Sequence, residues 1–346
     1  MPELTTIWFW LVAVMFTLWA VLDGFDFGVG VLHRFVARTD TERREVLAAI
    51  GPVWDGNEVW LLAAGGSMFL AFPRLLAAGF SGFYLPIVFV LWALILRGVS
   101  IELRSHLPST LWRSFFDTTF MLGSLAVPVL MGAALGNVVR GVPLQASGYF
   151  ELALFAPAGT PGVLEAYTVL CGVLVLVTLT AHGANWLLWK TGGPVQARVR
   201  AVRLPLWLAA IGLWLTTAFF TWRVSPDVFE SAFTKPMAWL GLALTLGGAA
   251  TVVLRRAYER APFFGGAAFI AGCLVTTVAS LFPVVLRAQG GPELSLTVLN
   301  ASSGATSMRA GLVWWGPGVL LAAGYYWWVM RHFRGKVVAA ADGEGY

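Results

Sequence analysis

The amino-acid sequence predicts an all-α protein that crosses a membrane many times, and three observations support that prediction. Only 12% of the 346 residues are charged, about half of the roughly 25% typical of soluble domains. Hydrophobic residues make up 58% of the chain, and the mean hydropathy is +0.76. Nine apolar runs are each long enough to cross about 30 Å of hydrocarbon as a helix. We therefore expect one integral membrane domain with nine transmembrane helices.

The nine expected spans follow one another with short connections. They are 7–32, 50–72, 78–101, 115–139, 163–189, 204–222, 236–254, 262–286 and 310–330. The first run is too long for a cleaved signal peptide and is interpreted as a retained span. The connections 140–162 and 287–309 are rich in Gly, Pro, Ser and Thr, and we expect them to cover the outer surface. The two cysteines lie in apolar runs and are interpreted as packed thiols.

Lys and Arg fix the orientation of these spans. Of the 23 Lys and Arg residues, 17 follow odd-numbered spans. They are Arg34, Arg38, Arg43, Arg44, Arg97, Arg104, Arg113, Lys190, Arg198, Arg200, Arg203, Arg255, Arg256, Arg260, Arg331, Arg334 and Lys336. The positive-inside rule makes that side cytoplasmic, so the N-terminus faces outside and the C-terminus faces the cytoplasm. The net charge of +5 follows this topology and is not interpreted as nucleic-acid binding.

Four carboxylates lie inside the first two apolar runs. Asp23 and Asp26 occur in VLDGFDFGVG, and Asp55 and Glu58 occur in GPVWDGNEVW. A carboxylate inside a membrane helix costs at least ~2.5–3.5 kcal/mol, so such residues usually have a function or a partner. Each pair is three residues apart and shares a helix face. Given the orientation, both pairs converge on the cytoplasmic side.

Glu102 and Asp117 lie on the same side, at the end of span three and the start of span four. One interpretation is that these acids are solvated or paired with Arg34, Arg97 and Arg104. Another is a hydrated, carboxylate-lined entry for cytoplasmic protons, because buried carboxyls can exchange protons near neutral pH. The spacing does not distinguish proton uptake from cation binding. A secondary transporter is a further alternative, which the clustering of the acids toward one leaflet disfavours.

The four histidines provide no clear haem or metal site. His33, His106, His182 and His332 all fall at predicted cytoplasmic ends of spans. Haem iron and copper need a strong ligand held inside the bundle. We expect no buried histidine, no metal site and no cofactor bound by this chain.

At these residues the chain resembles a known family. DGFDFGVG, TDTERR, GPVWDGNEVW, FSGFYLP and SLFPVVL … SLTVLNASS are similar to subunit II of the bacterial cytochrome bd-type quinol oxidases. The resemblance implies a multi-pass protein of the bacterial cytoplasmic membrane, in a heterodimer with the haem-bearing subunit I. That complex oxidises membrane quinol, reduces O2 to water with cytoplasmic protons and contributes to the proton-motive force. Haems b and d, or b only, are then expected in subunit I, and this chain has no catalytic residue of its own.

The resemblance also implies an arrangement and a set of site residues. The arrangement is two four-helix bundles, approximately 1–140 and 163–286, plus a ninth, peripheral helix at 310–330. The residues carried onto the proton pathway are Trp54, Asp55, Glu102, Asp23, Asp26 and Arg97. Glu58 is Gln in some relatives, which argues that its charge is not essential. A structural quinone or lipid in this subunit and small single-span accessory subunits stay open.

Overall fold

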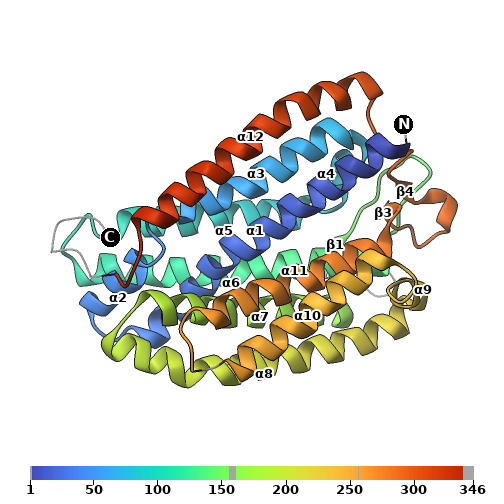
Figure 1. The fold of residues 1–346 in the computed structure, drawn as a ribbon. Helices are drawn as coiled ribbons and strands as arrows, with labels where there is room; N and C mark the ends of the chain where they lie inside the picture. The colour runs from blue at the N-terminus through green and yellow to red at the C-terminus, as the bar shows by residue number, and fades with distance from the viewer. Residues whose placement is uncertain (1, 156–160, 256, 338–346) are drawn as a thin grey trace.

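A computed structural model describes residues 2–155, 161–255 and 257–337 of the chain. Its long helices run side by side in one elongated bundle, with short connections at the two ends (Figure 1). The first helix begins at one end of the bundle and the last helix finishes at the other (Figure 1). The helices are α1 (Pro2–Val36), α2 (Asp40–Ala48), α3 (Trp54–Ala71), α4 (Pro73–Gly82), α5 (Tyr84–Leu103), α6 (Thr110–Arg140), α7 (Ala166–Lys190), α8 (Gly193–Val224), α9 (Pro226–Ser231), α10 (Pro236–Leu254), α11 (Ala261–Leu281) and α12 (Ala305–His332).

Each expected span overlaps a long helix, but not all of these helices are both long enough and apolar enough to cross a membrane. Within the described ranges, seven helices are long and apolar enough to cross a membrane: α1, α5, α6, α7, α8, α10 and α11. The pair α3 and α4 makes an eighth if it is counted as one span, but the pair is bent by 119°. The bend falls at Phe72–Pro73, where Pro73 has no backbone N–H to continue the first helix and instead begins the second. Crossing by α12, a helix of 28 residues, stays a prediction.

Helix α1 is the central helix of the bundle, in contact with α3, α6, α7 and α11. Its approach to α7 is a backbone contact between glycines. A Cβ atom built on Gly28 would lie 2.0 Å from the carbonyl oxygen of Leu179, and one on Gly183 would lie 2.4 Å from the carbonyl carbon of Gly28. Only glycine permits this approach, as small residues do in membrane helix pairs. The contact joins the first half of the chain to the second.

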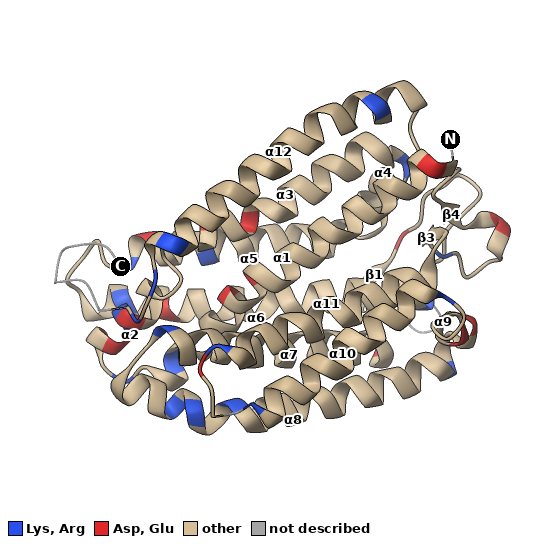
Figure 2. Ribbon diagram, in the orientation of Figure 1, with Lys and Arg blue, Asp and Glu red and all other residues tan. Residues whose placement is uncertain are grey.

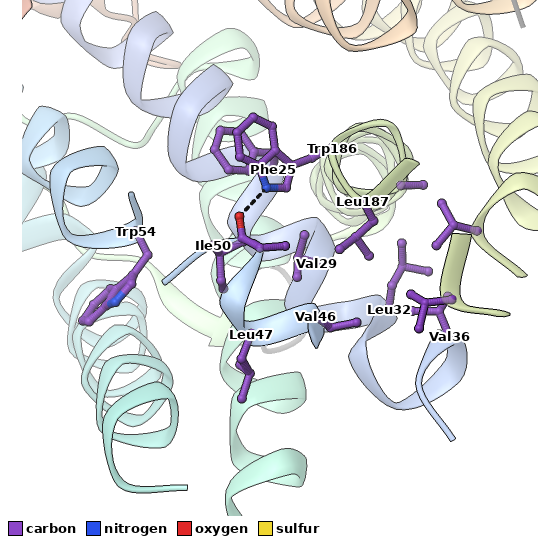
Figure 3. Close-up of a cluster of buried hydrophobic side chains, with 14 of the residues drawn as sticks. Phe25, Val29, Leu32, Val36, Val46, Leu47, Ile50, Trp54, Trp186 and Leu187 are labelled. Carbon is purple, nitrogen blue, oxygen red and sulfur yellow. Dashed lines mark hydrogen bonds between the residues drawn. The ribbon is translucent and has the colours of Figure 1, made fainter. Parts of the chain in front are cut away.

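A buried apolar cluster fixes the inner part of α1 against α2 and α7 (Figure 3). Phe25 stacks on Trp186 with ring centroids 4.2 Å apart. The Trp186 Nε1–H donates to the carbonyl oxygen of Ala49 at 2.9 Å, which satisfies the buried indole. Phe25 lies between the two aspartates of α1, so this packing also fixes their direction.

The two longer connections carry short strands at the end of the bundle opposite α2 (Figure 1). Strand β1 (Ala153–Phe155) pairs in parallel with β2 (Gly162–Leu164). Strand β3 (Val284–Leu286) pairs antiparallel with β4 (Leu296–Thr297), and the 3-10 turn η1 (Pro292–Leu294) lies between them. An isolated bridge between Val142 and Ala288 joins the two connections. Lys and Arg gather mainly at the other end, beside α2 (Figure 2).

Candidate functional site: a buried carboxylate cluster

The centre of the candidate site is an ion pair between α1 and α5. Arg97 Nη1 donates to Asp23 Oδ1 at 2.5 Å, and both side chains are fully buried. The second oxygen of Asp23 accepts from Trp19 Nε1 at 2.9 Å, one turn earlier on α1. The guanidinium carbon of Arg97 also lies 4.4 Å from the centre of the Phe27 ring. Asp23 is therefore held on both oxygens.

The first turns of α3 complete the cluster. Arg97 Nη2 donates to Glu58 Oε2 at 3.3 Å, and the Glu58 side chain is 25% exposed. Asn57 Nδ2 donates to Asp26 Oδ2 at 2.8 Å, with both residues fully buried. Two neighbouring residues of α3 thus bind two different members of the cluster, Asn57 the aspartate Asp26 and Glu58 the arginine Arg97.

The cluster holds more negative groups than positive ones. Among the described contacts, Arg97 is the one cation beside three acids, and it binds Asp23 and Glu58, whereas Asp26 is bound by Asn57. Taking charges out of water is costly, so uncompensated buried carboxylates favour binding a proton or a cation. The arrangement is chemically suited to taking up and giving back protons.

Asp55 and Glu102 lie outside the buried cluster on exposed helix faces; they interact electrostatically with each other, and Asp55 also interacts with Arg97 and Glu58. Asp55 begins an exposed stripe on α3 that continues through Val59, Leu62 and Phe69. Glu102 ends a similar stripe on α5, formed by Trp92, Ile95, Leu96 and Val99. Each stripe is apolar apart from one acid. The two acids lie close to each other, at the start of α3 and the end of α5.

The structure divides the predicted site residues into two groups. Asp23, Asp26 and Arg97 come together in the buried cluster, whereas Asp55 and Glu102 stand at the surface. Trp54 is buried and lies between α3 and α5, with its ring 3.3 Å from a Cβ built on Gly98. Glu58, which sequence reasoning set aside, binds Arg97.

Sequence reasoning also missed Asn57. The available signal was its place between Asp55 and Glu58, near the start of an expected membrane helix. Its contact with Asp26 depends on how α3 is turned about its own axis against α1. A hydropathy pattern does not report that rotation.

A second buried carboxylate organises the positively charged end of the bundle. Asp117 on α6 is fully buried and accepts from His33 Nε2 at 2.7 Å, Arg43 Nη1 at 2.8 Å and Arg104 Nε at 2.5 Å. Arg104 also donates to Asp40 at 2.8 Å. Helices α1, α2, α5 and α6 therefore meet at one acid.

Helix α2 continues this network to the second half of the chain. Glu42 pairs with Arg198 at 2.6 Å, and Glu45 Oε1 accepts from the backbone N–H of Gly192 at 3.0 Å. Slight burial opposes ionisation of Glu42, but its bond from Arg198 and those from the backbone N–H groups of Arg38 and Thr39 hold its pKa below the ordinary value. Helix α2 is thus an ionic link across the two halves.

The expectation that no histidine is buried is wrong for two of the four. His33 and His182 are both fully buried. His182 lies beside α1, with Nε2 3.1 Å from the carbonyl oxygen of Val21, and its ring stacks on Phe263 at 4.8 Å. His33 lies just past the expected run 7–32 and is covered by α6, whereas His182 lies within the run 163–189 and is covered by α1 and α11. Within the described ranges, no group of three or more His, Cys, Asp or Glu residues is placed to hold a metal ion.

An apolar cavity of about 280 Å³ lies between α1, α6, α7, α8 and α11. Trp19, Phe27, Met131, Trp214 and Phe269 are among the residues that line it. The lining fits an acyl or isoprenoid chain better than a charged group, because apolar side chains dominate it.

Comparisons with known proteins agree on one family. The family model described as cytochrome bd terminal oxidase subunit II matches residues 4–333. The chain is 32% identical to cytochrome bd-I ubiquinol oxidase subunit 2 of Escherichia coli K12, covering 94% of this chain and 93% of that protein. It is 34% identical to cytochrome bd ubiquinol oxidase subunit 2 of Bacillus subtilis, covering 89% of each.

A solved structure shares the fold. A chain of the bd oxidase from Geobacillus thermodenitrificans superposes with a TM-score of 0.77 at 18% identity, covering 96% of this chain and 98% of that one. At this identity the likeness supports the fold alone.

Proposed function

The chain belongs to the cytochrome bd terminal oxidase subunit II family, and from that premise we propose that it supplies cytoplasmic protons to a haem-bearing subunit I. Family membership makes it a multi-pass protein of the bacterial cytoplasmic membrane and a subunit of a quinol-oxidising respiratory complex. It also favours this function over the secondary transporter considered from sequence. The haems b and d, or b only, would lie in the partner, where quinol is oxidised and O2 is reduced.

The observation that carries the proposal is a gradient of burial along the acids of α3, α5 and α1. Asp55 and Glu102 are exposed, Glu58 is partly exposed, and Asp23 and Asp26 are fully buried. Arg97 joins the partly exposed and buried members through its two bonds. Such a row of carboxyls can pass protons from the surface inward when water molecules bridge its members. Trp54 would limit water access beside it.

The exposed stripes of α3 and α5 favour a partner on this face. An acid set within an apolar surface is costly to leave against lipid. Covering the stripes with subunit I would bury their apolar side chains and enclose Asp55 and Glu102 at the interface between the two subunits. Protons would then enter along the interface. Small single-span accessory subunits remain compatible with the other exposed apolar faces.

The proposed topology has nine crossings, with the N-terminus outside and the C-terminus in the cytoplasm. Supporting it, the described Lys and Arg residues gather at the end that holds α2, where α12 also finishes (Figure 2). Two four-helix groups, 1–140 and 163–286, with a peripheral helix at 310–330, are compatible with the observed helix order. The cavity beside Trp19 is the place where we propose a structural lipid or quinone tail.

The substitution Asp55→Asn tests the function. We expect oxidase turnover of the purified two-subunit complex to fall by up to about 10²-fold, the lower end of the contribution of a positioned proton donor or acceptor, with the haem spectrum retained. Asp227→Asn is the matched control, because Asp227 is 65% exposed and pairs with Arg287 in the outer connections. Unchanged turnover in fully assembled Asp55→Asn complex would refute proton entry at this residue.

A further inference from the structure

The contact between Asp26 and Asn57 leaves one oxygen on each residue without a donor. Asn57 Nδ2 already donates to Asp26 Oδ2 at 2.8 Å. Asp26 Oδ1 and Asn57 Oδ1 are both buried, and neither accepts a hydrogen bond from any described residue. A buried acceptor left unpaired has lost its hydrogen bonds to water and gained none in exchange. Two such acceptors at one contact call for a shared donor.

One proton can satisfy both oxygens. A carboxylic acid and a primary amide can pair face to face through two hydrogen bonds, one from the amide N–H and one from the acid O–H. The first of these bonds is present between Asn57 and Asp26. A proton on Asp26 Oδ1 would supply the second, directed to Asn57 Oδ1.

The charges around the pair favour the neutral acid. Arg97 donates to Asp23 and Glu58 and makes no described hydrogen bond to Asp26; its attraction for an ionised Asp26 is smaller than the repulsion from Asp23. Asp26 is fully buried beside these two other carboxyls, and Tyr326 of α12 also interacts with it electrostatically but makes no described hydrogen bond to it. Removing its charge relieves repulsion and avoids the cost of a second uncompensated buried anion. Asp23 differs, because Arg97 and Trp19 satisfy its two oxygens as a carboxylate.

We propose that Asp26 is held as a neutral carboxylic acid whose Oδ1–H donates to Asn57 Oδ1, and that Asn57 is its positioning residue. The use of this proton rests on the proposed function: Asp26 gives and regains it, while Asp23 is the fixed counter-ion of Arg97. On release, the proton passes to water or another acceptor, and Oδ1 keeps the bonding electron pair. The Asn57 N–H then still holds the carboxylate through Oδ2.

Infrared spectroscopy of the purified two-subunit complex in H2O and D2O tests the protonated pair. We expect a carbonyl stretch in the region of protonated carboxylic acids that moves in D2O and disappears in Asp26→Asn. Asn57→Ala should shift the band to higher wavenumber, because the carbonyl loses its N–H donor. Glu58→Gln, a change in the same cluster, should retain the band. Haem content per complex reports assembly of each variant.

The absence of the band, or a band that survives Asp26→Asn, would overturn the proposal, and an unshifted band in Asn57→Ala would overturn the pairing. If Asp26→Asn does not assemble, the Asn57→Ala shift alone decides. Turnover separates this inference from the proposed function. A band lost in Asp26→Asn with turnover unchanged would keep the protonated acid and refute its use in proton supply. If the wild type has no band and Asp26→Asn loses turnover, the protonated acid is refuted and the use of Asp26 in proton supply is retained.

Discussion

Arg97 and Asp23 form a fully buried ion pair, with Nη1 of Arg97 2.5 Å from Oδ1 of Asp23. The pair joins α5 to α1 at the level where α3 contributes Asn57 and Glu58. It gives the two aspartates of α1 different surroundings, although they are only one helical turn apart. Asp23 is bound to a cation, and Asp26 is bound to an amide.

Removing the cation should destabilise the complex. Arg97→Met leaves Asp23 buried without its counter-ion, and breaking one side of a buried pair typically costs about 3–5 kcal/mol. We expect a lower midpoint of thermal unfolding and less haem per purified complex. Arg255→Met is the control, because Arg255 is exposed at the end of α10. The double variant Asp23→Asn/Arg97→Met should recover part of the loss. Equal stability of Arg97→Met and Arg255→Met would contradict the buried pair.

The glycine contact between α1 and α7 gives a prediction about packing. Gly28→Ala places a Cβ 2.0 Å from the carbonyl oxygen of Leu179, which no side-chain rotation can relieve. We expect a loss of at least about 1–3 kcal/mol, as for overpacked cores, and a lower yield of assembled complex. Gly212→Ala on α8 meets nothing within 4 Å and should be neutral or stabilising by up to about 1 kcal/mol. Thermal unfolding of the two purified complexes measures the difference, and comparable midpoints would mean that the helices can separate at no cost.

Hydropathy predicted the helices because it measures what each segment leaves in lipid or inside the bundle. It ended the second span at residue 72, where the bend falls, but it did not predict that residues 73–82 form the separate helix α4. Pro73 was the local signal, since it cannot donate a backbone hydrogen bond.

The candidate site was predictable in part. Asp23 and Asp26 stand out because charge is rare in an apolar run, and both are in the buried cluster. Glu58 was set aside by comparison with relatives, yet it binds Arg97. Asn57 carries no charge and gave no comparable signal. Their contacts depend on the rotation of α3 against α1 and α5, which is a tertiary property.

Reporter fusions test the proposed topology. A reporter active only in the cytoplasm, fused to the C-terminus, should be active, whereas the same reporter placed after Gln289 should be silent. The physical reason is the excess of Lys and Arg at the α2 end, which resists translocation. Residue 289 lies in the connection between α11 and α12, next to the Val142–Ala288 bridge. The opposite pattern would mean that the membrane orientation is reversed, with the acid cluster on the wrong side for cytoplasmic proton uptake.

Asp117 gives the last prediction, which concerns α2 rather than proton supply. Asp117→Asn keeps the shape of the side chain but removes the charge that His33, Arg43 and Arg104 share. We expect a loss of stability smaller than the cost of a fully uncompensated buried charge, about 3–5 kcal/mol, because Arg104 keeps its pair with Asp40 and Arg43 is partly exposed. Because Arg43 belongs to α2, this helix should loosen first. Trypsin added to inside-out vesicles should then cleave the α2 arginines faster than in the wild type.

Asp227→Asn again serves as the control, because its pair with Arg287 is exposed at the other end of the bundle and contributes only about 0–1 kcal/mol. Haem spectra and turnover of Asp117→Asn complexes that do assemble should stay near wild type, since Asp117 makes no described contact with the Arg97 cluster. Unaltered trypsin cleavage together with lost turnover would reverse this assignment. It would place Asp117 on the proton route and leave α2 held mainly by Glu42 and Glu45.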